Sequence, residues 1–143
     1  MSGEDVIHNA EQVVCSCQAE NTVLLPCSGG SNCGQIANQV AVKLTEGGMG
    51  RIYCLAGIGG HIQGMIESAG SATRIVALDG CTVACAKKIV EHAGLRVTDW
   101  ICVTEEGIEK NREFALKEAD IALIVQRTRE SLTKPAAASG SAT

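Results

Sequence analysis

Cysteines are the residues with the clearest chemical potential, and two of them stand in the stretch Asp-Gly-Cys-Thr-Val-Ala-Cys at 79–85. This stretch follows an apolar run at 74–78 and precedes a segment with helical spacing at 86–92. That order is typical of a strand, a tight turn and a helix start. Thiols on the first turns of a helix meet unpaired N–H groups and the positive end of the helix dipole, which favour thiolate chemistry. The spacing of four residues predicts that Cys81 and Cys85 share one helix face.

Two further cysteines come at the ends of apolar runs. Cys27 follows a short run at 22–25 that Pro26 closes, and Cys54 lies near the end of a run at 51–56. The carboxyl ends of parallel strands meet at one edge of a sheet, where such sheets bind ligands. Three separate segments would therefore bring four thiols together, which are the number and type of ligands that a tetrahedral zinc site accepts.

The other candidate ligands have simpler interpretations. Cys102 stands between apolar residues of an expected strand, which favours a place in the core. Cys33 is interpreted as a small apolar position in the first loop or helical turn, although it could join or replace Cys27. His61 is interpreted as a turn residue near solvent, with metal binding or proton transfer as the alternative. Asp79 could cap the helix that follows it or accept a proton.

The elements that must position these residues alternate between strand-like and helix-like patterns. Strands are expected at 22–25, 51–56, 74–78 and 97–104, and helices at 35–45, 61–69, 86–92, 107–117 and 120–132. A fifth strand at 121–125 is the alternative to the last helix. Four strand–loop–helix units in series predict an α/β fold with three layers, in which a mostly parallel, four-stranded, Rossmann-like sheet carries helices on both faces.

The 143 residues are expected to form one α/β domain at 22–132. A flexible arm at 1–21 precedes it, and an Ala/Ser/Gly-rich, disordered tail at 133–143 follows. The arm carries Cys15 and Cys17, which we interpret as an exposed and oxidisable pair without a fixed role. Transient sharing of the metal, or protection of the main site, is the alternative for this pair.

Composition narrows the classes of function. Aromatic residues make up 2% of the chain and its net charge is −4, so binding of nucleic acid is disfavoured. No apolar run approaches the roughly 20 residues of a membrane span, and the acidic start does not resemble a signal peptide. We therefore expect a cytoplasmic protein. In that compartment eight cysteines indicate metal binding or redox chemistry more than disulfides.

Several stretches together resemble the DGC-domain family, whose members are described as zinc-binding proteins. The matching stretches are Pro-Cys-Ser-Gly at 26–29, Gly-Gln-Ile-Ala-Asn at 34–38, Tyr-Cys-Leu-Ala-Gly-Ile-Gly-Gly-His at 53–61, Asp-Gly-Cys at 79–81, Cys-Ala-Lys-Lys at 85–88 and Val-Thr-Glu-Glu-Gly-Ile at 103–108. The resemblance implies that Cys27, Cys54, Cys81 and Cys85 chelate the metal. The chain departs from the family pattern at Cys33, where a non-thiol residue is usual, and in its N-terminal extension.

The favoured function is the binding of zinc or another thiophilic metal by these four cysteines, either as a structural site or for metal handling. A thiol-based redox or transfer enzyme is the alternative, with Cys81 as the nucleophile and Cys85 or Cys54 as the resolving thiol. An iron–sulfur cluster could also be held by four thiolates in glycine-rich loops. A nucleotide-binding enzyme is disfavoured, because the loop at 27–34 lacks the lysine of a phosphate loop and the Rossmann glycine pattern. The expected partner is a metal ion, with no nucleic acid and no membrane.

Overall fold

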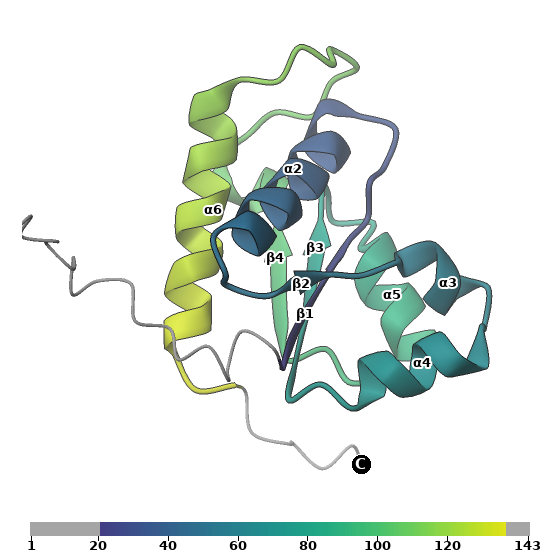
Figure 1. The fold of residues 1–143 in the computed structure, drawn as a ribbon. Helices are drawn as coiled ribbons and strands as arrows, with labels where there is room; N and C mark the ends of the chain where they lie inside the picture. The colour runs from purple at the N-terminus through teal and green to yellow at the C-terminus, as the bar shows by residue number, and fades with distance from the viewer. Residues whose placement is uncertain (1–20, 137–143) are drawn as a thin grey trace, which may run out of the picture.

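The computed structural model describes residues 21–136, which contain a four-stranded parallel sheet with the strand order β2-β1-β3-β4 (Figure 1). The strands are β1 (Thr22–Pro26), β2 (Arg51–Ile52), β3 (Arg74–Asp79) and β4 (Asp99–Cys102). Every strand pair in this sheet is parallel, as the sequence predicts. The expected arm with Cys15 and Cys17, and most of the expected tail, lie outside the described residues.

Helices cover both faces of the sheet (Figure 1). One face carries α2 (Asn32–Glu46) and α6 (Glu118–Thr133), and the other carries α3 (Leu55–Gly59), α4 (Gln63–Gly70) and α5 (Cys85–His92). A short 3-10 helix, η2 (Val103–Glu106), follows β4. The predicted three-layer α/β architecture is therefore confirmed.

Successive side chains of the central strands point to opposite faces of the sheet, and they divide the core into two clusters. In β1, Leu24 packs with residues of α2 and α6, whereas Val23 and Leu25 pack with residues of α3, α4 and α5. All three side chains are fully buried. Because successive strand residues point to opposite faces, a strand that is apolar at every position must be covered on both sides. The continuous apolar runs at 22–25 and 74–78 therefore become the two central strands.

The segment between β4 and α6 differs most from expectation. The prediction of a helix at 107–117 is wrong, because this segment is an irregular loop. Gly107 ends η2 in the left-handed region, with φ +87°. Beyond it, the loop backbone hydrogen-bonds to Asn32 of α2 instead of forming its own helical ladder. The segment after Lys117 forms one continuous helix, so the alternative of a fifth strand at 121–125 is also wrong.

The second strand is shorter than predicted. It pairs with β1 over only two residues, and the chain then turns into α3 with Cys54 as the residue before its first turn. Residues 57–59, which lie between the strand expected at 51–56 and the helix expected at 61–69, therefore belong to α3. Gly57 of this helix lies so close to the side chain of Met65 that a Cβ at this position would clash. The fourth strand likewise ends early, at Cys102.

A partly buried arginine, Arg74, joins the amino ends of β3 and β4 to the last turn of α6. The Arg74 guanidinium donates two hydrogen bonds to Asp99, at 2.8 and 3.0 Å, and further bonds to the carbonyl oxygens of Ser131, Leu132 and Lys134. Burial alone raises the pKa of Asp99, but hydrogen bonds from Arg74, Ser131 and a neighbouring threonine outweigh it and lower that pKa. This cluster lies at the edge of the sheet opposite to the carboxyl ends of the strands.

Candidate metal and thiol site

Cys27 lies at the carboxyl end of β1, where its backbone N–H donates to the carbonyl oxygen of Leu78 at 2.9 Å. Its Sγ accepts a hydrogen bond from the N–H of Gly80 at 3.3 Å. Burial raises the pKa of the Cys27 thiol, and the N–H groups of Gly80 and Gly29 act in the opposite direction without cancelling that effect. The site therefore favours the neutral thiol of Cys27 unless a cation is bound nearby.

Glycines allow close backbone contacts between the loop after β1, the first turn of α2 and the loop after β3. A Cβ on Gly34 would lie 2.5 Å from the carbonyl oxygen of Gly29. A Cβ on Gly80 would lie 2.5 Å from the backbone nitrogen of Gly34. No other residue type fits at these two positions without moving the backbone. This contact is what places the loop of Cys81 beside Cys27.

The two loops and the start of α5 enclose a cavity of about 250 Å³. Its lining residues are Cys27, Gly29, Gly30, Ser31, Gly34, Asp79, Gly80, Cys81, Val83, Cys85 and Lys110. Three of the four predicted ligand cysteines thus share one cavity. Cys27 and Cys81 are half-buried, and Cys85 is exposed.

The pair Cys81 and Cys85 is arranged differently from the prediction. Helix α5 begins at Cys85, so Cys81 lies in the turn that precedes the helix and not on its face. This turn is closed by a hydrogen bond from the N–H of Ala84 to the carbonyl oxygen of Cys81 at 3.1 Å. Ala84 is in the left-handed region, with φ +57°. Both residues line the cavity because the turn folds back.

Asp79 caps α5, which was one of the two interpretations of this residue. Its Oδ1 accepts the N–H of Ala86 at 2.8 Å, and its Oδ2 accepts the N–H of Lys87 at 3.1 Å. Oδ2 also accepts the indole N–H of Trp100 at 2.9 Å. The side chain is 1% exposed, and N–H donors use both of its oxygens. Asp79 therefore fixes where α5, and with it Cys85, begins.

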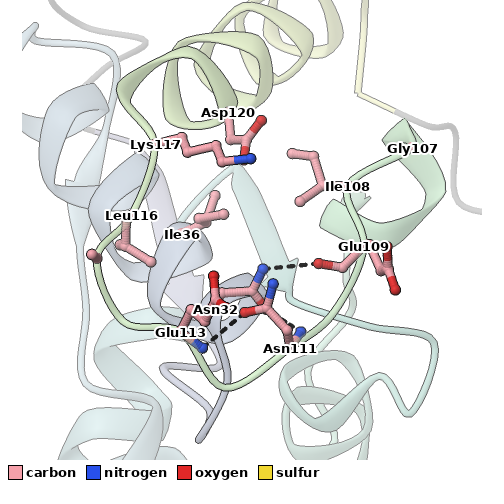
Figure 2. Close-up of a pocket in the computed structure, with 11 residues that line it drawn as sticks. Asn32, Ile36, Gly107, Ile108, Glu109, Asn111, Glu113, Leu116, Lys117 and Asp120 are labelled. Atoms are coloured by element: carbon pink, nitrogen blue, oxygen red, sulfur yellow. Dashed lines mark hydrogen bonds between the residues drawn. The ribbon is translucent and has the colours of Figure 1, made fainter.

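Lys110 belongs to the cavity, although the sequence analysis did not single it out. Its Nζ lies 3.4 Å from the Sγ of Cys81 and can donate to it. The residues on either side of Lys110 are held by Asn32, as Figure 2 shows. The amide of Asn32 donates to the carbonyl oxygen of Glu109 at 2.8 Å and accepts the N–H of Asn111 at 2.7 Å. The backbone of Asn32 adds a third bond, to the carbonyl oxygen of Asn111.

The other cysteines of residues 21–136 do not line the cavity. Cys54 is exposed at the start of α3 and does not line it. Cys33 is fully buried in the core beside α6, and Cys102 is 4% exposed at the end of β4, so both core interpretations are confirmed. His61 is exposed in the turn after α3, as expected of a turn residue near solvent. Within residues 21–136, no group of three or more His, Cys, Asp or Glu side chains is already close enough to hold one metal ion.

Fold and site together define a parallel α/β protein that presents thiols from glycine-rich loops at the carboxyl edge of its sheet. The sequence model of the DGC domain matches residues 23–128, which is more than half of the chain. The protein therefore belongs to the DGC-domain family, and the Asp-Gly-Cys tripeptide at 79–81 ends β3 and begins the loop at the cavity.

A named relative is the "Anaerobic and virulence modulator AnvM" of Pseudomonas aeruginosa strain PAO1. It is 34% identical over 84 residues, which are 59% of this chain and 64% of the relative. The match thus spans a little under two thirds of the relative's length. No solved structure matches the chain. None of the helices in the described part of the chain is long and apolar enough to cross a membrane.

Proposed function

We propose that the protein binds a thiophilic metal ion, zinc in the first place, through Cys27, Cys81 and Cys85. The observation that carries this proposal is that three thiols from two distant segments line one cavity at the carboxyl edge of the sheet. Thiolates are the preferred ligands of zinc and of other soft or borderline metals. The donor type at this edge therefore suits such an ion.

The surroundings of the thiols also suit a bound cation and its thiolate ligands. Cys27 already accepts a backbone N–H, as metal-bound thiolates commonly do. The ammonium of Lys110 would offset part of the excess negative charge of three thiolates on one divalent ion. Burial raises the pKa of Cys27, so metal binding would displace its proton and the affinity would increase with pH.

Binding requires the sulfurs to move closer together, because no three-ligand group is preformed in the described residues. The side chains of Cys81 and Cys85 are the two that can rotate towards a metal, since Cys81 lies in a turn outside the helices and Cys85 is exposed. The core clusters on both faces of the sheet contain no part of this turn, so we expect the domain to fold without the metal. These features favour an exchangeable, metal-handling site over a structural one.

The test is the metal content of the full chain, purified anaerobically from cells grown with added zinc. We expect Cys27→Ser, Cys81→Ser and Cys85→Ser each to lose most of the zinc that the wild type retains. Cys54→Ser is the matched control, because it removes an exposed thiol outside the cavity. Equal zinc in all five proteins would contradict the proposal. If Cys54→Ser also loses zinc, Cys54 is the fourth ligand. If the purified protein is brown and contains iron and sulfide, the site holds an iron–sulfur cluster instead of zinc.

A second candidate function is nucleophilic thiol chemistry at Cys81, favoured by its contact with Lys110. A cation beside a cysteine at a partly open cavity is the environment of many reactive thiols. Cys85 lines the same cavity and could resolve an intermediate on Cys81. Metal-free protein treated with a limiting amount of maleimide should then be labelled first at Cys81. Labelling of Cys54 at the same rate or faster would contradict this function.

A further inference from the structure

Two histidines that the cysteine site does not use lie side by side on the surface. The Nε2 of His61 is 3.2 Å from the Nδ1 of His92, so that one ring nitrogen donates a hydrogen bond to the other, and the ring centroids are 5.2 Å apart. A metal ion bound by both nitrogens would displace the proton of this hydrogen bond. His61 follows α3 and His92 is the last residue of α5, so the pair joins two separate segments of the chain. Both side chains are exposed.

The pair is distinct from the cysteine cavity. Cys85 begins α5 and His92 ends it, so the two residues are about 10 Å apart along the helix axis. Neither histidine lines the cavity. An inference about this pair therefore stands or falls independently of the function proposed for the cysteines.

We propose that His61 and His92 form a binding site for a divalent first-row transition metal ion, with nickel, copper(II) and zinc as the class of ligand. Two imidazole nitrogens on one such ion, each at about 2.0–2.1 Å and at a tetrahedral angle, stand about 3.3 Å apart. The observed separation of 3.2 Å matches this value. Neutral imidazole is the common protein ligand of all three ions.

The site has two protein ligands and is completed by water. In the part of the chain that the structure describes, no third His, Cys, Asp or Glu joins this pair in a metal-sized group. Such an open site exchanges its metal and holds it less tightly than a site with four protein ligands. His92 lies at the carboxyl end of α5, where the helix dipole favours a positive charge.

Hydrogen bonds fix the backbone at His61. His61 has φ +55°, and the bonds from its own N–H to Ile58 and from the N–H of Ile62 to Gly57 form the hydrogen-bond pair of a Schellman motif. Glycine is the usual residue at this left-handed position. A bulkier residue there, in contact with a second histidine, is the kind of local strain that marks functional positions.

The test uses the untagged full chain and nickel ions. The sequence has three histidines, so the ring C–H signals of His61 and His92 can be followed by proton NMR with His8 as an internal reference. We expect substoichiometric Ni²⁺ to broaden the signals of His61 and His92 before that of His8. Titration calorimetry should show that His61→Gly and His92→Gln each weaken nickel binding by about tenfold or more.

The variant His61→Gly separates loss of the ligand from loss of the fold. Glycine relieves the left-handed backbone, so the metal-free variant should melt no lower than the wild type. Cys81→Ser should retain the nickel response, because it alters only the cysteine cavity. Unchanged nickel affinity in His61→Gly and His92→Gln would overturn the inference. So would a nickel response that disappears in Cys81→Ser, an outcome that would leave the function proposed for the cysteines intact.

Discussion

Asn32 is the residue whose replacement should disturb the cysteine cavity without touching a thiol. Its side chain holds the backbone on both sides of Lys110, through Glu109 and Asn111. In Asn32→Ala both side-chain bonds are lost, and only the backbone bond from residue 32 to the carbonyl oxygen of Asn111 still ties this part of the loop to α2. We expect Lys110 to leave its position beside Cys81 as a result.

The size of the effect follows from these contacts. Two hydrogen bonds, at about 1 kcal/mol each, predict that Asn32→Ala lowers the free energy of unfolding by about 2 kcal/mol. Lys110 is exposed, so its attraction for an anion at the sulfur is close to the value in water, about 1 kcal/mol at 4 Å. That energy corresponds to about a fivefold change in the rate at which Cys81 reacts with an anionic reagent.

The assay compares two alkylating reagents that differ in charge. Iodoacetate is negatively charged and iodoacetamide is neutral. The rate with iodoacetate divided by the rate with iodoacetamide therefore measures how strongly the ammonium of Lys110 attracts the anionic reagent to Cys81. Mass spectrometry locates the modified cysteine, and urea denaturation gives the free energy of unfolding. We expect Lys110→Gln to lower the ratio about fivefold and Asn32→Ala to produce most of that decrease. High salt should reduce the difference, because it screens exposed charges.

Lys117→Gln is the matched control, because Lys117 lies at the other end of the same loop and does not line the cysteine cavity. It should leave the rate ratio at Cys81 unchanged. If Lys110→Gln lowers the ratio and Asn32→Ala does not, the amide of Asn32 does not position the lysine. If neither variant changes the ratio, the contact between Lys110 and Cys81 does not persist in solution.

Three further predictions concern stability. Asp99→Asn should lower the free energy of unfolding in urea by about 1.5–3 kcal/mol, because it leaves the partly buried Arg74 without its counter-charge. The pKa of Asp99 is lowered, so its contribution is present above about pH 4 and is lost as pH falls further. Burial raises the pKa of Cys33, so the unfolded chain loses this proton at a lower pH than the folded protein does. The free energy of unfolding, measured by denaturant titration, should therefore fall as pH rises above about 9, and it should fall less in Cys33→Ala. Gly34→Ala should cost about 1–3 kcal/mol in thermal unfolding, because its Cβ would meet backbone; unchanged melting would contradict that contact.

The sheet and the placement of three cysteines around one cavity could be predicted because both follow from short-range patterns. The apolar runs that became β1 and β3 contain residues for both faces, and Cys27 and Cys81 follow directly at their carboxyl ends. The position of Cys54 could not be predicted. The apolar run at 51–56 does not show that β2 pairs over only two residues and that the chain then turns into α3.

The contribution of Lys110 was hidden for another reason. It depends on hydrogen bonds between Asn32 and residues 77 and 79 positions later in the chain, which no local periodicity reveals. The histidine pair was hidden in the same way, because a left-handed turn after α3 brings His61 to the end of α5. The glycines at 57–60 indicate a change of chain direction, but they do not indicate where the side chain of His61 lies.

The carbonyl oxygens in the last turn of a helix are usually left to solvent, and helices therefore fray from their ends. In α6 the guanidinium of Arg74 occupies those of Ser131 and Leu132. Because Arg74 is also the first residue of β3, opening the end of α6 means disturbing a central strand. The amide protons in that final turn should therefore exchange with deuterium almost as slowly as those of the sheet, and partial unfolding must start elsewhere in the domain.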